Sequence, residues 1–109
     1  MEKHALYHMT WKEIEEVFKN DPVVIIPMGS TEQQGIHSLT GDYLAAEAIA
    51  KRVAEKAGVY YVPVIPFGCS EYFRCFPGTI SLRPSTVEAV ITDVVESLTE
   101  HGITKILFH

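Results

Sequence analysis

The residues best suited to chemistry are Glu32, His37 and Asp42, which share the glycine-containing segment 27–42. Carboxylate and imidazole groups bind divalent ions such as Zn²⁺, Mn²⁺ and Fe²⁺. Simpler roles are also open, because Asp42 suits a helix cap, Glu32 a solvated loop and His37 a surface turn. Spacing by itself therefore does not decide between a metal site and these alternatives.

The elements around this segment predict where it lies. The apolar run 23–26, bounded by Pro22 and Pro27, is typical of a fully buried strand. A helix pattern begins at Asp42, which suits an N-cap, and continues to residue 57. The segment thus follows the carboxyl end of a strand, where open α/β sheets form their ligand crevices.

Capping and periodicity predict three helices. Thr10 and Glu13 form a capping box for a first helix that runs to about residue 19. The last helix starts at Pro84 with a second capping box over 85–88, and glycines end the second and last helices. The helix that begins at Asp42 carries an apolar stripe on one face, formed by Ala45, Ala48, Ile49 and Val53.

Two further strands are predicted, at 59–65 and 103–108, with an aperiodic loop at 66–84. Strands that alternate with helices indicate one α/β domain over residues 1–109, a parallel β-sheet flanked by helices. No covering helix follows the third strand, so we expect a fold truncated there. Its exposed sheet edge should seek a partner, either another copy or a C-terminal fragment.

Composition narrows the function classes. A formal net charge of −5 argues against nucleic-acid and anionic-membrane surfaces, and a small-molecule substrate is expected instead. No apolar run reaches the length of a membrane span, and no signal peptide is evident, so we expect a cytoplasmic protein. The spacing of Cys69 and Cys75 matches no zinc or redox signature, which favours two reduced thiols.

Two separated motifs resemble the creatininase (creatinine amidohydrolase) family. The first is Pro-x-Gly-Ser-Thr-Glu-Gln at 27–33, followed by Gly35-x-His37 and Gly41-Asp42. The second is Phe-Pro-Gly-Thr-Ile-Ser-Leu-Arg-Pro at 76–84. The resemblance extends from about residue 11 to residue 109 and implies a three-layer α/β/α fold.

The resemblance also implies a chemistry. Family members are metal-dependent hydrolases that act on cyclic amides or formamides, and one branch is tied to cyclic ketones of inositol. Glu32 matches a metal ligand, and Asp42 matches an aspartate that bridges two metals, so both are expected to be catalytic. The metal, expected to be Zn, Mn or Fe, activates a water and polarises the substrate carbonyl.

The chain departs from the family pattern at the second metal. The family's Glu-Gln-His supplies a histidine ligand, but Gln34 stands at that position, and an amide is a poorer ligand than an imidazole. The second metal is therefore in doubt. His37 lies close enough along the chain to be considered as a substitute ligand. The interval from Glu32 to Asp42 is one residue shorter than usual.

The long loop supplies the candidates for substrate binding. Tyr72 and Phe73 offer ring surfaces, and Arg74 offers a guanidinium for carboxylate or hydroxyl oxygens. The family's Asn-Gly-His motif, which supplies another histidine ligand, would follow residue 109. We therefore expect residues 1–109 alone to be inactive. The alternative is a non-catalytic, truncated or regulatory α/β module of the same fold.

Overall fold

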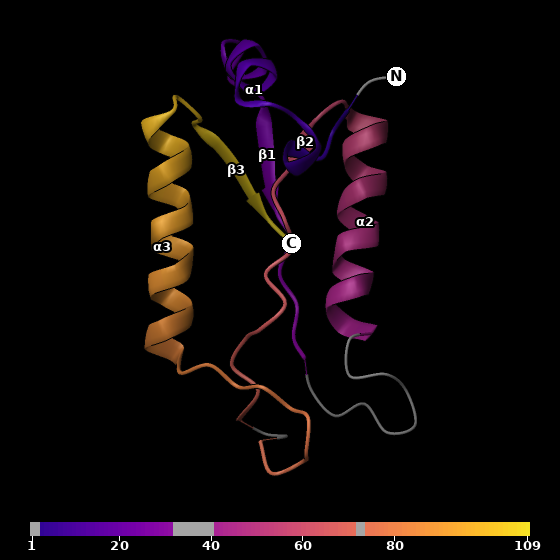
Figure 1. The fold of residues 1–109 in the computed structure, drawn as a ribbon, viewed down its shortest axis with the longest axis vertical. Helices are drawn as coiled ribbons and strands as arrows, with labels where there is room; N and C mark the ends of the chain where they lie inside the picture. The colour runs from indigo at the N-terminus through magenta and orange to yellow at the C-terminus, as the bar shows by residue number, and fades with distance from the viewer. Residues whose placement is uncertain (1–2, 32–40, 72–73) are drawn as a thin grey trace.

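The computed structural model describes residues 3–31, 41–71 and 74–109. Its centre is a parallel sheet of three strands with the order β2-β1-β3. Helices α2 and α3 cover opposite faces of this sheet (Figure 1), which confirms the predicted α/β/α layering. In chain order the elements are η1 (Leu6–His8, a 3₁₀ helix), α1 (Trp11–Phe18), β1 (Val23–Ile26), α2 (Gly41–Ala57), β2 (Tyr60–Tyr61), α3 (Pro84–Glu100) and β3 (Lys105–Phe108).

Strand β1 is the core of the molecule because it pairs on both sides and is covered on both faces. Val24, Ile25 and Ile26 are at most 1% exposed. Successive side chains point to opposite faces of a strand. Ile25 accordingly packs on the α2 side, whereas Val24 and Ile26 pack on the α3 side with Leu98. The predicted fully buried strand is confirmed.

Helix α2 turns a different face to the sheet than its apolar stripe predicts. Its buried residues are Ala46, Ala50 and Ala54, spaced one helical turn apart. Ile49 and Val53 of the predicted stripe are 47% and 42% exposed. Small side chains let the helix axis lie close to the strands, so the larger residues flank the contact.

The helix starts are partly as predicted. Thr10 caps α1 with the expected capping box to Glu13. Pro84 is the first residue of α3, but Arg83 occupies the N-cap and makes no side-chain cap bond, so the capping box over 85–88 is wrong. Helix α2 begins at Gly41, which puts Asp42 in the first turn instead of at the N-cap. Proline already fixes the first helical φ, so α3 can begin without a polar cap.

Strand β2 is shorter than the predicted 59–65 because Pro63 interrupts it. Proline has no N–H to donate to a neighbouring strand. Pairing resumes after it, where the Ile65 N–H donates to the Pro27 carbonyl (3.0 Å) and the Gly29 N–H donates to the Ile65 carbonyl (2.9 Å). The β2 segment therefore still follows β1 beyond its end.

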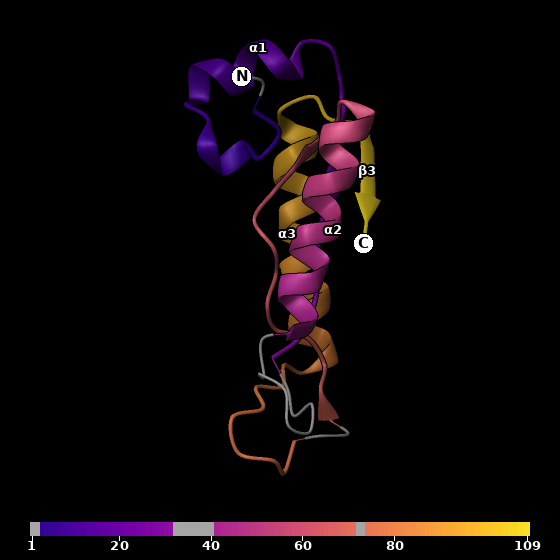
Figure 2. The same ribbon diagram turned by 90° about the vertical axis from the view of Figure 1, so that its right-hand side faces the viewer.

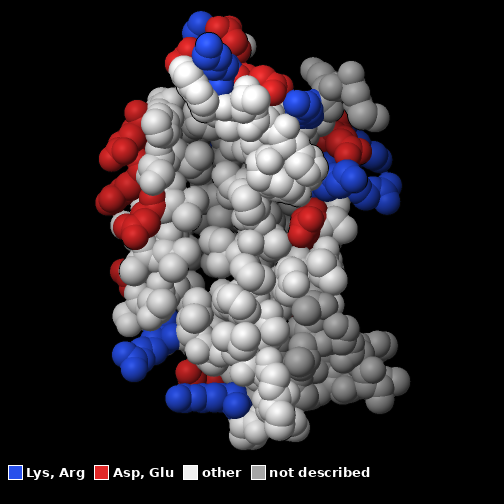
Figure 3. Space-filling view, viewed as in Figure 1, with Lys and Arg blue, Asp and Glu red and all other residues white. Residues whose placement is uncertain are grey.

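The outer surface of α3 is acidic. The helix carries Glu88, Asp93, Glu96 and Glu100 but no Lys or Arg. Figure 3 shows acidic side chains along its outer flank, so this side of the helix faces water. Among the described residues, no helix combines the length and apolarity that crossing a membrane requires.

Candidate functional site

The motif segment leaves the sheet between two strands. The Met28 N–H donates to the His109 carbonyl (2.8 Å), and the His109 N–H donates to the Ile26 carbonyl (3.1 Å). The carboxyl ends of β1 and β3 therefore lie side by side. With the order β2-β1-β3, the chain first moves from β1 to one side and then to the other, which makes this pair of ends the topological switch point. Ligands of open α/β sheets bind at such points.

Gly29 brings the first turn of α2 against this end of the sheet. A Cβ atom at position 29 would lie 2.4 Å from the Tyr43 Cα and 2.9 Å from its backbone nitrogen. No side chain fits in that space, and backbone atoms cannot move aside as a flexible side chain can. Glycine in the motif is thus explained by the close approach of the strand end and the helix start.

This approach brings Asp42 to the motif. The Ser30 Oγ donates a hydrogen bond to the Asp42 Oδ2 (3.1 Å). Asp42 is exposed and belongs to the first turn of α2, where a negative charge is favoured by the helix dipole. The carboxylate predicted to bind metal therefore lies at the carboxyl edge of the sheet and accepts a hydrogen bond from a hydroxyl of the motif.

The two predicted motifs meet in space. The Ile80 N–H donates to the Thr31 carbonyl (2.9 Å), so the second motif pairs with the residue that precedes Glu32. Thr31 is buried, and its Oγ1 donates to the Pro66 carbonyl (3.0 Å). Pro66 and Ile80 of the long loop are therefore attached to the candidate site through backbone and hydroxyl groups.

Of the remaining predicted site residues, only Arg74 belongs to the described part of the chain. Glu32, His37, Tyr72 and Phe73 lie outside the described residues. Arg74 is described, and its guanidinium pairs with Glu71 at 3.3 Å, with its side chain 73% exposed.

A metal centre does not emerge from the described residues alone. Within residues 3–31, 41–71 and 74–109, no three His, Cys, Asp or Glu side chains come close enough together to hold an ion. Of the three predicted ligands, only Asp42 belongs to this part of the chain. The carboxylate and imidazole donors that the sequence offers still fit a divalent ion by their chemistry.

Two hollows of the described surface lie elsewhere. A groove of about 830 Å³ is lined by residues of α1 and the end of α3, and one of about 520 Å³ lies between the amino-terminal segment, β2 and α2. The first is the larger but is mostly apolar, and neither includes a motif residue. We place the candidate site at the carboxyl edge because the two motifs and Asp42 meet there.

Comparison with known proteins gives the family. Residues 7–109 match the model of the creatininase family, described as creatinine amidohydrolase. The chain belongs to this family. The match covers both motifs and every helix and strand from η1 to β3, apart from the residue that begins η1.

Named relatives agree with this assignment. The creatinine amidohydrolase of Pseudomonas putida is 34% identical over 106 residues, which cover 91% of this chain and 41% of the relative. The 3-dehydro-scyllo-inosose hydrolase of Thermotoga maritima is 31% identical over 89% of this chain and 32% of its own length. A solved structure described as creatininase Mn is 32% identical with a TM-score of 0.92, and the match covers 98% of this chain and 44% of that one. The chain therefore spans less than half the length of these relatives.

Ser30 is the site residue that the sequence analysis missed. It was part of the first motif, but no role was assigned to it. A hydroxyl directly after a glycine at a strand end, with an acidic residue opening the next helix, is the signal that the sequence offered. The contact itself depends on how closely α2 approaches Gly29, which no local pattern reports.

Proposed function

We propose that this chain is the amino-terminal part of a metal-dependent hydrolase of the creatininase type. Glu32, Asp42 and His37 are the proposed ligands of a divalent ion, which is Zn, Mn or Fe. The observation that carries the proposal is the hydrogen bond from Ser30 to the Asp42 carboxylate at the switch point of the sheet. Both residues lie in the stretch by which the chain resembles the family.

The proposed reaction is attack of water on a carbonyl group. When bound, the ion would supply an activated water and polarise the carbonyl oxygen. Glu32 and Asp42 would hold the ion, and Tyr72 and Phe73 would contact the substrate. Arg74 would first have to exchange its pairing with Glu71. The proposed substrate class comprises cyclic amides, formamides and cyclic ketones. The cyclic ketones draw support from the relative named as an inosose hydrolase.

The partner proposal follows from the number of ligands. Catalytic zinc sites typically use three protein ligands and keep one position for water. This chain offers only two ligands that match the family pattern, Glu32 and Asp42, because His37 does not match a ligand position of that pattern. We propose that residues 1–109 alone bind metal weakly and catalyse no turnover, and that a C-terminal half completes the site, either in the same chain or in trans.

A second candidate is a non-catalytic module of the same fold. It is favoured by Gln34, which stands where the family pattern has a histidine ligand. Bound-metal analysis of the purified protein separates the two candidates. A hydrolase should retain a divalent ion once the C-terminal half is present, whereas the non-catalytic module should contain none.

The experiment is a complementation assay. The mass-verified 109-residue chain is assayed with Zn²⁺ or Mn²⁺ against creatinine, a formamide and a cyclic inositol ketone. It is then assayed with the separately produced C-terminal half of the Pseudomonas putida relative, and that half alone is the control. Turnover only in the mixture supports the proposal. Turnover by the 109-residue chain alone would refute the inferred need for further ligands, and no turnover together with no bound metal in the mixture would refute the hydrolase.

A further inference from the structure

We propose that Ser30 is a positioning residue for Asp42, so that the motif serine sets the direction in which the carboxylate faces the site. The bond from the Ser30 Oγ to the Asp42 Oδ2 is 3.1 Å long. Its effect on the carboxylate is a property of this chain without any ligand. Its consequence for metal binding rests on the proposed function.

Ser30 can hold Asp42 in place because its own backbone is fixed on both sides. The preceding Gly29 donates its N–H to the Ile65 carbonyl (2.9 Å). The following Thr31 is buried, accepts the Ile80 N–H at its carbonyl (2.9 Å) and donates its Oγ1 to the Pro66 carbonyl (3.0 Å). The serine hydroxyl therefore projects from a backbone segment that hydrogen bonds hold on both sides.

Packing of the first turn of α2 fixes the backbone of Asp42 but not its side chain. The first turn of α2 lies so close to Gly29 that a Cβ there would fall 2.4 Å from the Tyr43 Cα. The carboxylate itself is exposed, and in water such a side chain exchanges freely between rotamers. Among the contacts of the described residues, the Ser30 hydroxyl is the one that selects an orientation for it.

The hydrogen-bond chemistry leaves the carboxylate able to bind an ion. A hydroxyl donates one proton, and an ionised carboxylate has about four acceptor positions. The bond to Oδ2 therefore occupies one position and leaves both oxygens with free lone pairs. Groups that orient metal ligands in this way typically contribute about 10-fold to 100-fold to metal affinity.

The test uses three variants of the 109-residue chain. Ser30→Ala removes the hydroxyl, Ser30→Thr keeps it, and Ser97→Ala makes the same chemical change on the exposed surface of α3. The first measurement is the set of three-bond NMR couplings that report the χ1 angle of Asp42 without metal. We expect one dominant rotamer in the wild type, Ser30→Thr and Ser97→Ala, and rotamer averaging in Ser30→Ala.

The second measurement is titration with Mn²⁺, followed by water-proton relaxation. Ser30→Ala should weaken binding by about 10-fold to 100-fold, and Ser30→Thr should restore it. Unchanged Asp42 couplings in Ser30→Ala would overturn the proposal whatever the metal does, as would averaged couplings in the wild type. If couplings change but neither the wild type nor any variant binds Mn²⁺, even with the C-terminal half of the Pseudomonas putida relative present, the positioning role stands and the proposed metal function fails.

Discussion

The β2 edge of the sheet is covered by the chain itself, whereas the outer side of β3 pairs with no strand in the described part of the chain. At the covered edge, the Tyr61 N–H donates to the His4 carbonyl (3.0 Å), and Ala5 forms a parallel bridge with Tyr61. At the open edge, Leu107 and Phe108 are 50% and 47% exposed. Figure 2 shows β3 on the side of the molecule opposite the amino-terminal segment and α1.

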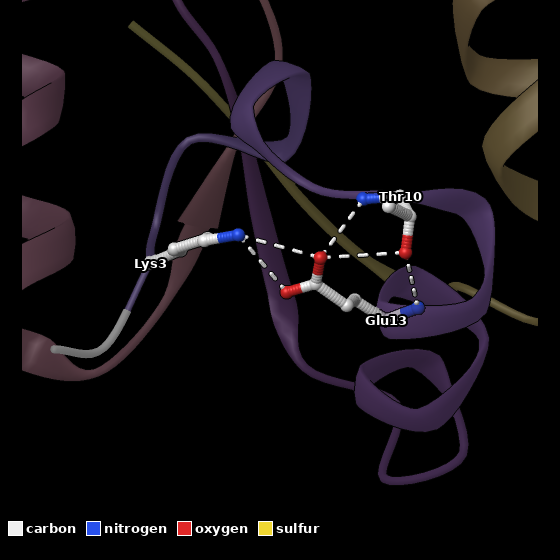
Figure 4. Close-up of polar contacts among 3 residues, drawn as sticks. All are labelled: Lys3, Thr10 and Glu13. Atoms are coloured by element: carbon white, nitrogen blue, oxygen red, sulfur yellow. Dashed lines mark hydrogen bonds and ion pairs between the residues drawn. The ribbon is translucent and has the colours of Figure 1, made fainter.

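The covered edge is held by a small polar network. The Lys3 Nζ donates to both carboxylate oxygens of Glu13, at 3.3 and 3.2 Å, and the Thr10 N–H donates to Glu13 Oε1 at 3.2 Å (Figure 4). The pKa of Glu13 is lowered by the Thr10 N–H first and by Lys3 second. The residues that cover β2 are thereby connected to the start of α1.

The difference between the edges indicates where association occurs. An unpaired strand edge presents free N–H and C=O groups and can add another strand. His4 and Ala5 block such an addition at β2. The outer side of β3 pairs with no strand in the described part of the chain, and β3 carries apolar side chains on both faces. We therefore expect the C-terminal half of the proposed assembly to join at β3.

The largest expected effect compares the same substitution at a core residue, which directly follows the residues that cover β2, and at the open edge. Leu6 is 7% exposed and packs with Val24, Ile26 and Leu98. Leu6→Ala should lower the free energy of unfolding by about 2–5 kcal/mol. Leu107→Ala should lower it by about 1 kcal/mol or less, because half of that side chain already meets water. Urea unfolding measures both, and equal losses would contradict the comparison.

For binding of the C-terminal half we expect the opposite order, with the larger effect at the open edge of β3. Leu107→Lys places a charge at the open edge, so it should weaken binding of the C-terminal half from the Pseudomonas putida relative by about tenfold or more. Val53→Lys, on the exposed flank of α2, is the matched control, and should bind like the wild type. Isothermal titration gives the affinities. Normal binding by Leu107→Lys would move the junction away from β3.

A smaller effect on the free energy of unfolding is expected from Thr10, the N-cap of α1, which lies close to the residues that cover β2. Thr10→Ala removes the acceptor of the Glu13 N–H (3.2 Å) and should cost about 1 kcal/mol of unfolding free energy. Thr92→Ala, at an exposed position inside α3, should be neutral or slightly stabilising because alanine is the better helix former. A cost for Thr92→Ala equal to that for Thr10→Ala would show that the cap contributes nothing specific.

The last prediction concerns a carboxylate on the β3 side. The Asp21 carboxylate accepts the hydroxyl and the N–H of Thr104, which lower its pKa and connect the start of β1 to the start of β3. A lowered folded-state pKa stabilises the fold above the unfolded value of about 3.9, and this stability is lost as the pH falls through the folded value.

The measurement is urea unfolding of the wild type and Asp21→Asn over a series of pH values. The wild type should be more stable than Asp21→Asn at neutral pH, and the difference should shrink as the pH falls below the unfolded pKa. A difference that is constant over the whole pH range would contradict the assigned cause.

Several elements could be predicted because local chemistry decides them. Thr10 and Glu13 specify the start of α1, and Pro84 specifies the start of α3, through hydrogen bonds and a fixed φ within a few residues. Gly58 and Gly102 end their helices at φ values of 69° and 92°, which residues with a Cβ rarely adopt. Val23–Ile26 is apolar enough to require burial on both faces.

The candidate site could be predicted in part. The family motif selected Asp42, and the structure brings it to the switch point, while the outcome for Glu32 and His37 lies outside the described residues. Ser30 could not be selected, because its partner is 12 positions away along the chain and the contact depends on where α2 lies.

Tertiary structure alone decided which face of α2 packs on the sheet and which edge of the sheet is covered. Periodicity favoured Ala45, Ile49 and Val53 as the inner face, but the contact at Gly29 draws α2 so near the sheet that alanines fill the interface. Likewise, no local pattern in residues 4–5 predicted that they would cover β2, since pairing is a property of two strands. Sequence determined which elements form and where they end, and the distances between them determined which side chains meet.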